Sequence, residues 1–428
     1  MTIGLMLAGM LGLALLNVPI AVALGLVGML AIVLNQGTAM LVNVPLVMFE
    51  GASSFPLLAI PLFILAGAIM NASSISRRLI AFASAVVGFI RGGLSMVAIG
   101  ASLFFAEISG SAVADVAALG SILIPEMKRR GYSKEVAAAV MSSSASLAII
   151  IPPSIPMILY AVMAQTSVVK MFVAGILPGL IGAVGLAIAA YWQARRYNFP
   201  VEERFQAARV WETFKEALWA FILPIAILGA IFGGLVTATE GAGMAVLAAL
   251  FVGGVIYRDL DFRELRKACI EGGIQTAVVM LLVASSALIG TFLTEAQVPQ
   301  KLAQGITGLT SDKYLVLLLL NVVFLILGMF LHSAAAIILV IPIVMPVVTA
   351  VGIDPIHFGL VVTLNLAIGQ QTPPVASVLM AACSIARSDI WETTKANIPF
   401  ILALLIVLVL CTYVPWTSLV LVEFFYGN

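Results

Sequence analysis

The segment Ile149-Ile-Ile-Pro-Pro-Ser-Ile-Pro156 places two adjacent prolines inside an apolar run long enough to cross a membrane. Proline removes a backbone donor, clashes with the preceding helical turn and disfavours helix at the residue before it, so the pair predicts a helix broken in its middle. In lipid such a break is tolerated only where protein or a water-filled cavity satisfies the freed carbonyl groups. At an offset of 221 residues Pro152-Pro153 falls on Pro373-Pro374, in Gln370-Gln-Thr-Pro-Pro374. Two broken spans at matching positions are typical of a transporter.

The composition indicates an all-α polytopic membrane protein. Of 428 residues, 62% are hydrophobic and 10% are charged, and the mean hydropathy is +1.18. This length of apolar sequence allows roughly ten to twelve crossings or half-crossings. The three cysteines have no metal-like spacing, and no cofactor motif or long basic tract is present. We therefore expect membrane lipid as a partner, no nucleic acid, and no cofactor.

Two further apolar stretches are interrupted at their centres by small polar residues. In Leu94 to Pro125 the interruption is Glu107-Ile-Ser-Gly-Ser-Ala-Val-Ala-Asp115, and in Tyr314 to Pro346 it is Gly328-Met-Phe-Leu-His-Ser333. The first stretch lies between Arg91 and Lys128-Arg129-Arg130, so both of its ends face the same aqueous side if it folds back on itself. Each stretch is therefore expected to form a re-entrant helical hairpin with the polar residues at its tip.

The loops at the duplicated glycine turn differ in charge. The first reads Lys128-Arg-Arg-Gly-Tyr-Ser-Lys134 and the second Thr349-Ala-Val-Gly-Ile-Asp-Pro355. The positive-inside rule places the first in the cytoplasm and the second outside. This assignment predicts inverted repeats, the arrangement in which many secondary transporters form a site near the middle of the membrane.

The expected organisation has six parts. Ser73 to Arg91 and Arg258 to Lys267 are expected as surface helices, and the apolar run Ile3 to Val33 is compatible with one long helix or two short ones. The six parts are N-terminal scaffold spans with a surface helix (1–92), the first hairpin, broken span and following span (93–193), a cytoplasmic connector (194–216), further scaffold spans with a surface helix (217–312), the second hairpin and broken span (313–386), and a C-terminal span (387–428).

Each half thus combines a hairpin tip with a broken helix, and both supply neutral oxygens. Sodium is a hard cation that unwound carbonyls and Ser or Thr hydroxyls bind well. The alternative is that these small residues only allow close helix packing. The expected sodium ligands are Ser109, Ser111, Pro152, Ser333 and Thr372. The wider sodium or substrate set adds Gly110, Asp115, Ile151, Pro153, Ser154, Gly328, His332, Gln370, Gln371 and Pro373.

Ionisable and amide side chains near these positions leave several roles open. Asp115 at membrane depth is a functional candidate that could hold an ion, shuttle a proton, or cap and pair within the hairpin. His332 is compatible with a pH-sensitive role or with a neutral, hydrogen-bonded ring. The amides of Gln370 and Gln371 suit a hydroxyl-rich or carboxylate substrate, or satisfy the broken backbone. No arginine falls at the predicted membrane centre.

With these motifs, the sequence resembles the large membrane subunit of the tripartite ATP-independent periplasmic (TRAP) transporters. The matching segments are Phe55–Gly67, Ser109–Asp115, Pro125–Tyr132, Ile150–Ser154 and Thr372–Pro374. The resemblance implies a multi-pass protein of the bacterial inner membrane, an elevator-type sodium-driven importer with a scaffold domain and a transport domain. It also implies a small four-helix membrane subunit and a periplasmic binding protein that delivers an organic acid.

Two departures from the family pattern bear on the site. The family often has Asp in the second tip where this chain has His332, and it commonly shows Thr-Pro-Pro-Val-Gly where this chain reads Gln370-Gln-Thr-Pro-Pro-Val-Ala-Ser377. The second variant resembles the sialic-acid branch, so sialic acid is the expected substrate, with C4-dicarboxylates next.

Three other functions are alternatives. A passive channel is disfavoured because a pore would not need duplicated hairpins. A stand-alone symporter of the divalent-anion/sodium type would have similar hairpins but no binding protein. A membrane enzyme built on Glu107, Asp115 and His332 is disfavoured because the sequence shows no nucleophile with its base and no metal-ligand cluster. We therefore expect a transporter and not an enzyme.

Overall fold

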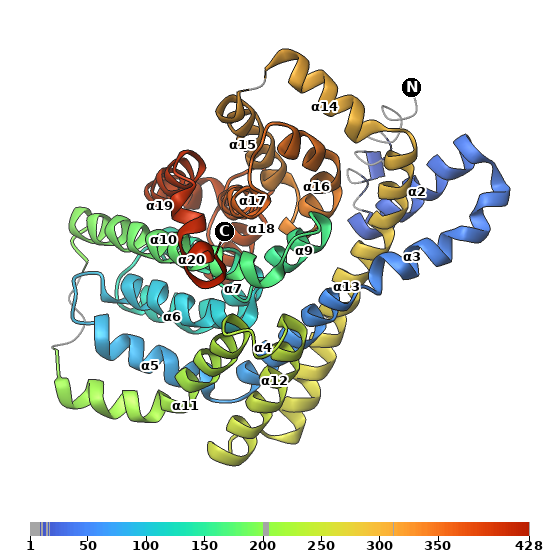
Figure 1. Ribbon diagram of the computed structural model, residues 1–428. Helices are drawn as coiled ribbons and strands as arrows, with labels where there is room; N and C mark the ends of the chain where they lie inside the picture. Colours follow the sequence, from blue (N-terminus) through green and yellow to red (C-terminus); the bar gives the residue numbers. More distant parts are fainter. Residues whose placement is uncertain are drawn as a thin grey trace.

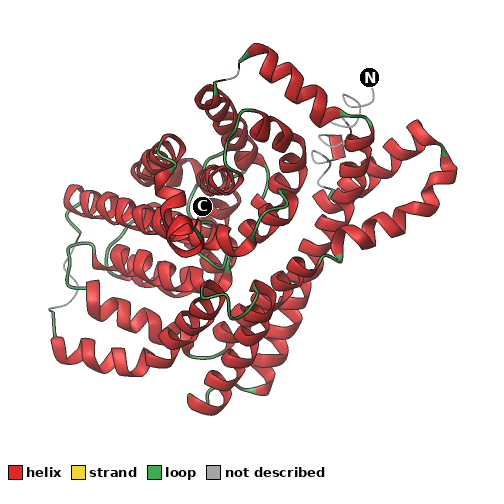
Figure 2. Cartoon of the chain, in the orientation of Figure 1, coloured by secondary structure: helices red, strands yellow, loops and turns green. Residues whose placement is uncertain are grey.

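The computed structural model describes residues 9, 12–13, 16, 18–199, 205–310 and 312–427. Within these ranges the secondary structure is helical, and loops join the helices (Figure 2). Eight helical stretches among them are long and apolar enough to cross a membrane. The all-α polytopic fold expected from composition is confirmed.

One group of helices, here called the arm, lies along the rest of the molecule: α2, α3, α4, α12 and α13 run together along one side, whereas α5 packs on α6 and α14 on α16 (Figure 1). Its longest member is α13, against which α2, α3 and α4 pack, while α12 packs on α4 and α11 on α5. The bounds in this group are α2 (Ile20–Gln36), α3 (Val44–Ala52), α4 (Ala59–Ala72), α5 (Ile75–Val87), α11 (Ala207–Phe232), α12 (Ala238–Phe251), α13 (Phe262–Glu295) and α14 (Val298–Leu309), with the short turns η1 (Thr38–Asn43), η2 (Phe55–Leu58) and η4 (Val252–Ile256).

The remaining helices form a compact body with the broken helices at its centre. All residues of α8, and all residues of α17, are buried except the first one or two of each. The bounds in the body are α6 (Gly93–Ser109), α7 (Ala112–Arg129), α8 (Lys134–Ala145), η3 (Ser146–Ile149), α9 (Ile155–Met163), α10 (Val168–Arg196), α15 (Lys313–Phe330), α16 (Ser333–Ala350), α17 (Pro355–Gly369), α18 (Ser377–Ala386), α19 (Ile390–Tyr413) and α20 (Trp416–Tyr426).

The two expected hairpins and two expected broken spans are present in this body. Helices α6 and α7 meet at Gly110-Ser111, and α15 and α16 meet at Leu331-His332. The first broken span is interrupted between η3 and α9, around a cis peptide bond between Pro152 and Pro153. The second is interrupted between α17 and α18.

Helix ends in the two halves match at the 221-residue offset. Ser133 caps α8 by accepting from the Val136 amide, and its counterpart Asp354 caps α17. Side-chain oxygens at this position satisfy amides that have no intrahelical partner. The duplicated turns also match, because the Tyr132 amide donates to the Met127 carbonyl and the Ile353 amide to the Val348 carbonyl, each at 3.0 Å.

The glycine in each turn has a positive φ, +89° at Gly131 and +72° at Gly352. An L side chain adopts such a conformation only with strain, so both copies of the turn require glycine.

One detail differs from the sequence expectations, and another lies mostly outside the described residues. Residues 262–267, expected as part of a separate surface helix, are the first turns of the 34-residue α13. Their charges are tolerated there because this end of the helix is largely exposed. Of the run from Ile3 to Val33, α2 begins after Pro19, and most of the earlier residues lie outside the described ranges.

Candidate functional site

Both hairpin tips and both helix breaks meet at one cavity of about 360 Å³. The first tip contributes Gly110 and Ser111, and the second contributes His332 and Ser333. Ile149 and Ile155 flank the first break, and Gln370 comes from the second. The opposite wall is the arm, chiefly α13 and the start of α2. The volume falls within the range of small-molecule sites.

The first tip lies directly against the first break. The Ile155 amide donates to the Gly110 carbonyl over 3.3 Å, which satisfies one backbone group freed by the prolines. Gly110 has a φ of +57°, and a Cβ added there would lie 2.8 Å from the Pro153 carbonyl oxygen. Glycine is therefore required at this tip both for its conformation and for the close approach.

The second tip meets the second break in a similar way. The Val375 and Ala376 amides both donate to the Met329 carbonyl at 3.2 Å. Gly328 packs on α17, where an added Cβ would lie 3.0 Å from the Gly369 Cα atom. Gly328 thus shapes the site by bringing α15 close to the break and does not line the cavity itself.

A buried carboxylate lies just behind the first tip. Asp115 is fully buried, and the Ser109 hydroxyl donates to its Oδ1 atom. The Ser111 amide in turn donates to Ser109 Oγ over 3.2 Å. Asp115 Oδ2 has no hydrogen-bond partner among the described residues. Because an unpaired buried carboxylate oxygen is costly, this atom marks a place where a cation or a proton would be stabilised.

His332 caps the helix that starts at the second tip. Its Nδ1 atom accepts from the Ala334 amide at 3.4 Å, while the side chain lines the cavity. A neutral imidazole that accepts at Nδ1 carries its proton on Nε2. In that tautomer the Nε2–H group of His332 is not used by the cap and is available as a hydrogen-bond donor.

The two neighbouring glutamines of the second break have different environments. Gln370 lines the cavity; its Oε1 atom accepts from the Ser377 hydroxyl, and its Nε2 atom is unpartnered among the described residues. Gln371 belongs to a buried network instead, because its Oε1 atom lies 2.7 Å from the Ser143 hydroxyl and accepts from Asn397 Nδ2 at 3.3 Å. Gln370 keeps a buried amide N–H donor that is unpaired among the described residues, whereas Gln371 joins α17 to α8 and α19.

The other residues expected at the site lie in or beside the breaks. The Ser154 hydroxyl donates to the Ile149 carbonyl at 2.8 Å, and the Thr372 hydroxyl donates to the Ile368 carbonyl at 3.0 Å. Each hydroxyl oxygen keeps lone pairs for a further contact. Residues Ile151, Pro152, Pro153 and Pro373 are buried behind the cavity and are not part of its lining.

Among the described polar residues of the lining, one was missed from the sequence. Gln275 of α13 faces the cavity from the arm, opposite the hairpin tips. Its only sequence signal is a single amide at the edge of the apolar stretch that starts at Thr276. No repeat or proline marks it, so its placement depends on how the arm packs against the body.

Comparison with known proteins supports a transporter. The family described as the DctM component of tripartite ATP-independent periplasmic transporters matches residues 7–417. The chain is 39% identical to the C4-dicarboxylate TRAP transporter large permease protein DctM of Pseudomonas aeruginosa, over 93% of each chain. It is 34% identical to the sialic acid TRAP transporter large permease protein SiaM of Vibrio cholerae, over 98% of each.

Two further matches bear on length and fold. The isethionate TRAP transporter permease protein DctMQ of Oleidesulfovibrio alaskensis is 39% identical over 93% of this chain, which spans 63% of that relative. The crystal structure of the Alcanivorax borkumensis YdaH transporter matches with a TM-score of 0.64 and 16% identity, covering 92% of this chain and 90% of that one. The latter likeness concerns the fold alone. The chain therefore belongs to the DctM component family of tripartite ATP-independent periplasmic transporters, as a multi-pass transporter permease of the inner membrane and not an enzyme.

Proposed function

We propose that this chain is the large permease subunit of a sodium-coupled TRAP importer for an organic acid. The observation that carries the proposal is the meeting of both hairpin tips and both helix breaks at one cavity. Secondary transporters place substrate and coupling ions at such junctions because broken helices offer carbonyls and amides that are otherwise unpaired.

Sodium is proposed to bind behind each tip. In the first half the oxygens on offer are the hydroxyls of Ser109 and Ser111, the carbonyls beside Pro152, and the unpartnered Oδ2 atom of Asp115. In the second half they are the hydroxyls of Ser333 and Thr372. Apart from Asp115 these ligands are neutral, as suits a monovalent cation that must bind and be released in every cycle.

The substrate is proposed to be held by neutral donors. Among the described residues that line the cavity none carries a full charge at neutral pH, while His332, Gln370, Gln275 and the tip serines offer hydrogen bonds. Apolar side chains such as Ile155 and Leu282 form the rest of the wall. An acid with one hydrogen-bonding end and an apolar or sugar-like body fits this lining. The pattern at Gln370–Ser377 favours sialic acid, and C4-dicarboxylates come next.

The proposal includes two partners and an elevator cycle. A periplasmic binding protein would deliver the acid, and a small four-helix membrane subunit would complete the complex. The body that holds both hairpins would move as a unit along the arm, because backbone hydrogen bonds join each hairpin tip to the break behind it. The arm would stay in place, since it contributes fewer groups to the cavity.

Uptake by the reconstituted complex tests this function. Proteoliposomes containing this chain and the small subunit are given labelled sialic acid, succinate or isethionate, with and without the binding protein and an inward sodium gradient. Uptake of at least one acid that requires both the gradient and the binding protein is expected. Uptake that proceeds without any binding protein would instead identify a stand-alone symporter, and the absence of a sodium requirement would remove the ion-coupled mechanism.

A further inference from the structure

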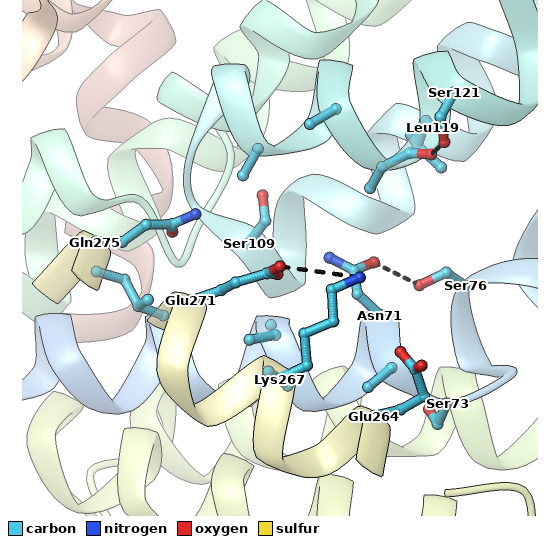
Figure 3. A pocket seen from close by; sticks show the side chains of 18 of the residues that line it. Asn71, Ser73, Ser76, Ser109, Leu119, Ser121, Glu264, Lys267, Glu271 and Gln275 are labelled. Carbon is cyan, nitrogen blue, oxygen red and sulfur yellow. Dashed lines mark hydrogen bonds and ion pairs between the residues drawn. The ribbon is translucent and has the colours of Figure 1, made fainter. Parts of the chain in front are cut away.

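A second cavity, of about 400 Å³, adjoins the central one and has a different lining. It lies between α7 of the body and the arm helices α4, α5 and α13 (Figure 3). Ile64 and Gln275 line both cavities, and Ser109 at the first tip reaches the second while its neighbour Gly110 lines the central one. The two cavities are therefore contiguous at the first hairpin tip. We refer to the second cavity as the vestibule.

The vestibule extends from the hairpin tip toward the basic end of α7. Its lining on that helix runs from Ala114 to Ile122, and α7 ends shortly afterwards at Lys128, Arg129 and Arg130. On the arm it reaches Arg77 of α5 and the start of α13. Since basic residues gather on the cytoplasmic side of inner-membrane proteins, the vestibule leads from the central cavity toward the cytoplasm.

Charge distinguishes the vestibule from the central cavity. Its lining includes Arg77, Lys267, Glu264 and Glu271. Asn71 adds an amide whose oxygen accepts from the Ser76 hydroxyl at 3.1 Å, which leaves the amide nitrogen as a donor. An anion that leaves the neutral central cavity would therefore meet its first full charges here, two positive from Arg77 and Lys267 and two negative from Glu264 and Glu271.

The ion pair between Lys267 and Glu271, drawn at the centre of Figure 3, is long and exposed to solvent. Lys267 Nζ lies 4.0 Å from Glu271 Oε1, and the two side chains are 66% and 59% exposed. An ion pair of this length and exposure contributes little to folding stability, so another anion can readily take the place of Glu271 beside Lys267. Arg77, on the neighbouring helix, has no ion-pair partner among the described residues and is exposed.

We propose that the vestibule is the passage by which the organic acid leaves the central cavity, and that Lys267 receives its anionic group there by exchanging Glu271 for the substrate. Arg77 and Asn71 would hold the acid beside Lys267 on its way out. This inference rests on the proposed function and adds an anion subsite on the arm, outside the hairpins and breaks.

A cysteine probe tests the anion subsite without requiring transport. Ser121 lines the vestibule and is exposed, so Ser121→Cys is made in a Cys269→Ser background, leaving the buried Cys383 and Cys411 in place. The complex in lipid nanodiscs is treated with an anionic or a cationic methanethiosulfonate reagent. The ratio of the two modification rates reports the charge felt by a small ion in the vestibule.

Lys267→Gln is expected to lower the anionic-to-cationic rate ratio by about threefold or more, while Lys267→Arg keeps it. Arg266→Gln is the matched control, because Arg266 is the adjacent exposed cation on α13 but does not line the vestibule; it should change the ratio much less. In the uptake assay Lys267→Gln should also slow turnover about fivefold.

The ratio of the anionic to the cationic modification rate tests whether Lys267 forms an anion subsite. A ratio that Lys267→Gln leaves unchanged, or lowers no more than Arg266→Gln does, would overturn the anion subsite. The proposed function is judged separately, by whether the wild-type complex shows sodium-dependent uptake, so the two proposals can fail independently.

Discussion

At the scale of single residues, the two ring nitrogens of His332 have separate tasks. Nδ1 accepts a hydrogen bond from the Ala334 amide and so caps α16, whereas the proton on Nε2 takes no part in the cap. The same residue thus caps α16 and keeps an N–H donor that is available to the proposed substrate. Its counterpart at the first tip, Ser111, also stands at the cap position of its helix, α7.

Substitution at His332 should separate these tasks. His332→Asn keeps a side-chain oxygen for the cap, but its amide N–H group lies closer to the backbone and does not reach the position of Nε2. The apparent KM for the acid should therefore rise about tenfold, as expected for the loss of one hydrogen bond to a charged group, with little loss of stability. His332→Ala should show the same rise and also destabilise the hairpin by about 1 kcal/mol through loss of the cap. Uptake kinetics and thermal unfolding measure the two effects. A His332→Asn variant with wild-type KM would show that the ring does not contact substrate.

At the scale of elements, each hairpin is held to its break by backbone contacts that only glycine allows. Gly110→Ala should therefore strain the first tip and push it away from the Pro153 carbonyl, reducing uptake by at least tenfold. Gly229→Ala in α11 is the control, because a Cβ there meets no atom within 4 Å and alanine favours helix. Equal uptake by the two variants would contradict a requirement for close contact between tip and break.

The network of Ser143, Gln371 and Asn397 joins three helices of the body. All three side chains are fully or almost fully buried, so Asn397→Ala should remove its hydrogen bonds with Ser143 and Gln371, leave a small cavity, and cost about 1 to 3 kcal/mol. Asn35→Ala on the exposed face of α2 should change stability by less than about 0.5 kcal/mol. The unfolding midpoint of the purified protein measures both changes. If Asn397→Ala unfolds at the wild-type temperature, the network does not stabilise the body.

Helix breaks and turns could be predicted from the sequence where the residues at that point are enough to cause them. Proline pairs interrupt a helix whatever surrounds them, and the glycine turns at Gly131 and Gly352 require positive φ in both copies, so the breaks and the turns were found in advance. The sequence could not show that Gln370 lines the cavity while Gln371 lies in a buried network. The two glutamines are adjacent and follow the same helix, and only the contact of Gln371 with Asn397 distinguishes their environments. Gln275 was missed for the same reason, since no local pattern shows which arm residue faces the hairpin tips.

The first turns of α13 show where a charge pattern gave a wrong prediction. Charges between Arg258 and Lys267 predicted a separate surface helix, yet α13 runs unbroken from Phe262. A helix continues through charged residues as long as one face remains exposed, so charge alone does not mark its end.

At the scale of the whole molecule, the arm and the body contribute unequally to the two cavities of the proposed substrate path. The body supplies both tips and both breaks, while the arm supplies Gln275 to the central cavity and Lys267 to the vestibule. Motion of the body along the arm would carry the tips and their ions together. The central claim is that movement of the acid is coupled to sodium bound behind the tips.

Sodium entry measured with a radioactive tracer tests that claim most directly. In proteoliposomes with the small subunit and the binding protein, the acid should stimulate sodium entry in the wild type, and Ser111→Ala or Thr372→Ala should weaken this stimulation and raise the sodium concentration for half-maximal uptake by about tenfold. Acid uptake that proceeds without any stimulation of sodium entry, or unchanged sodium activation in both variants, would contradict the account.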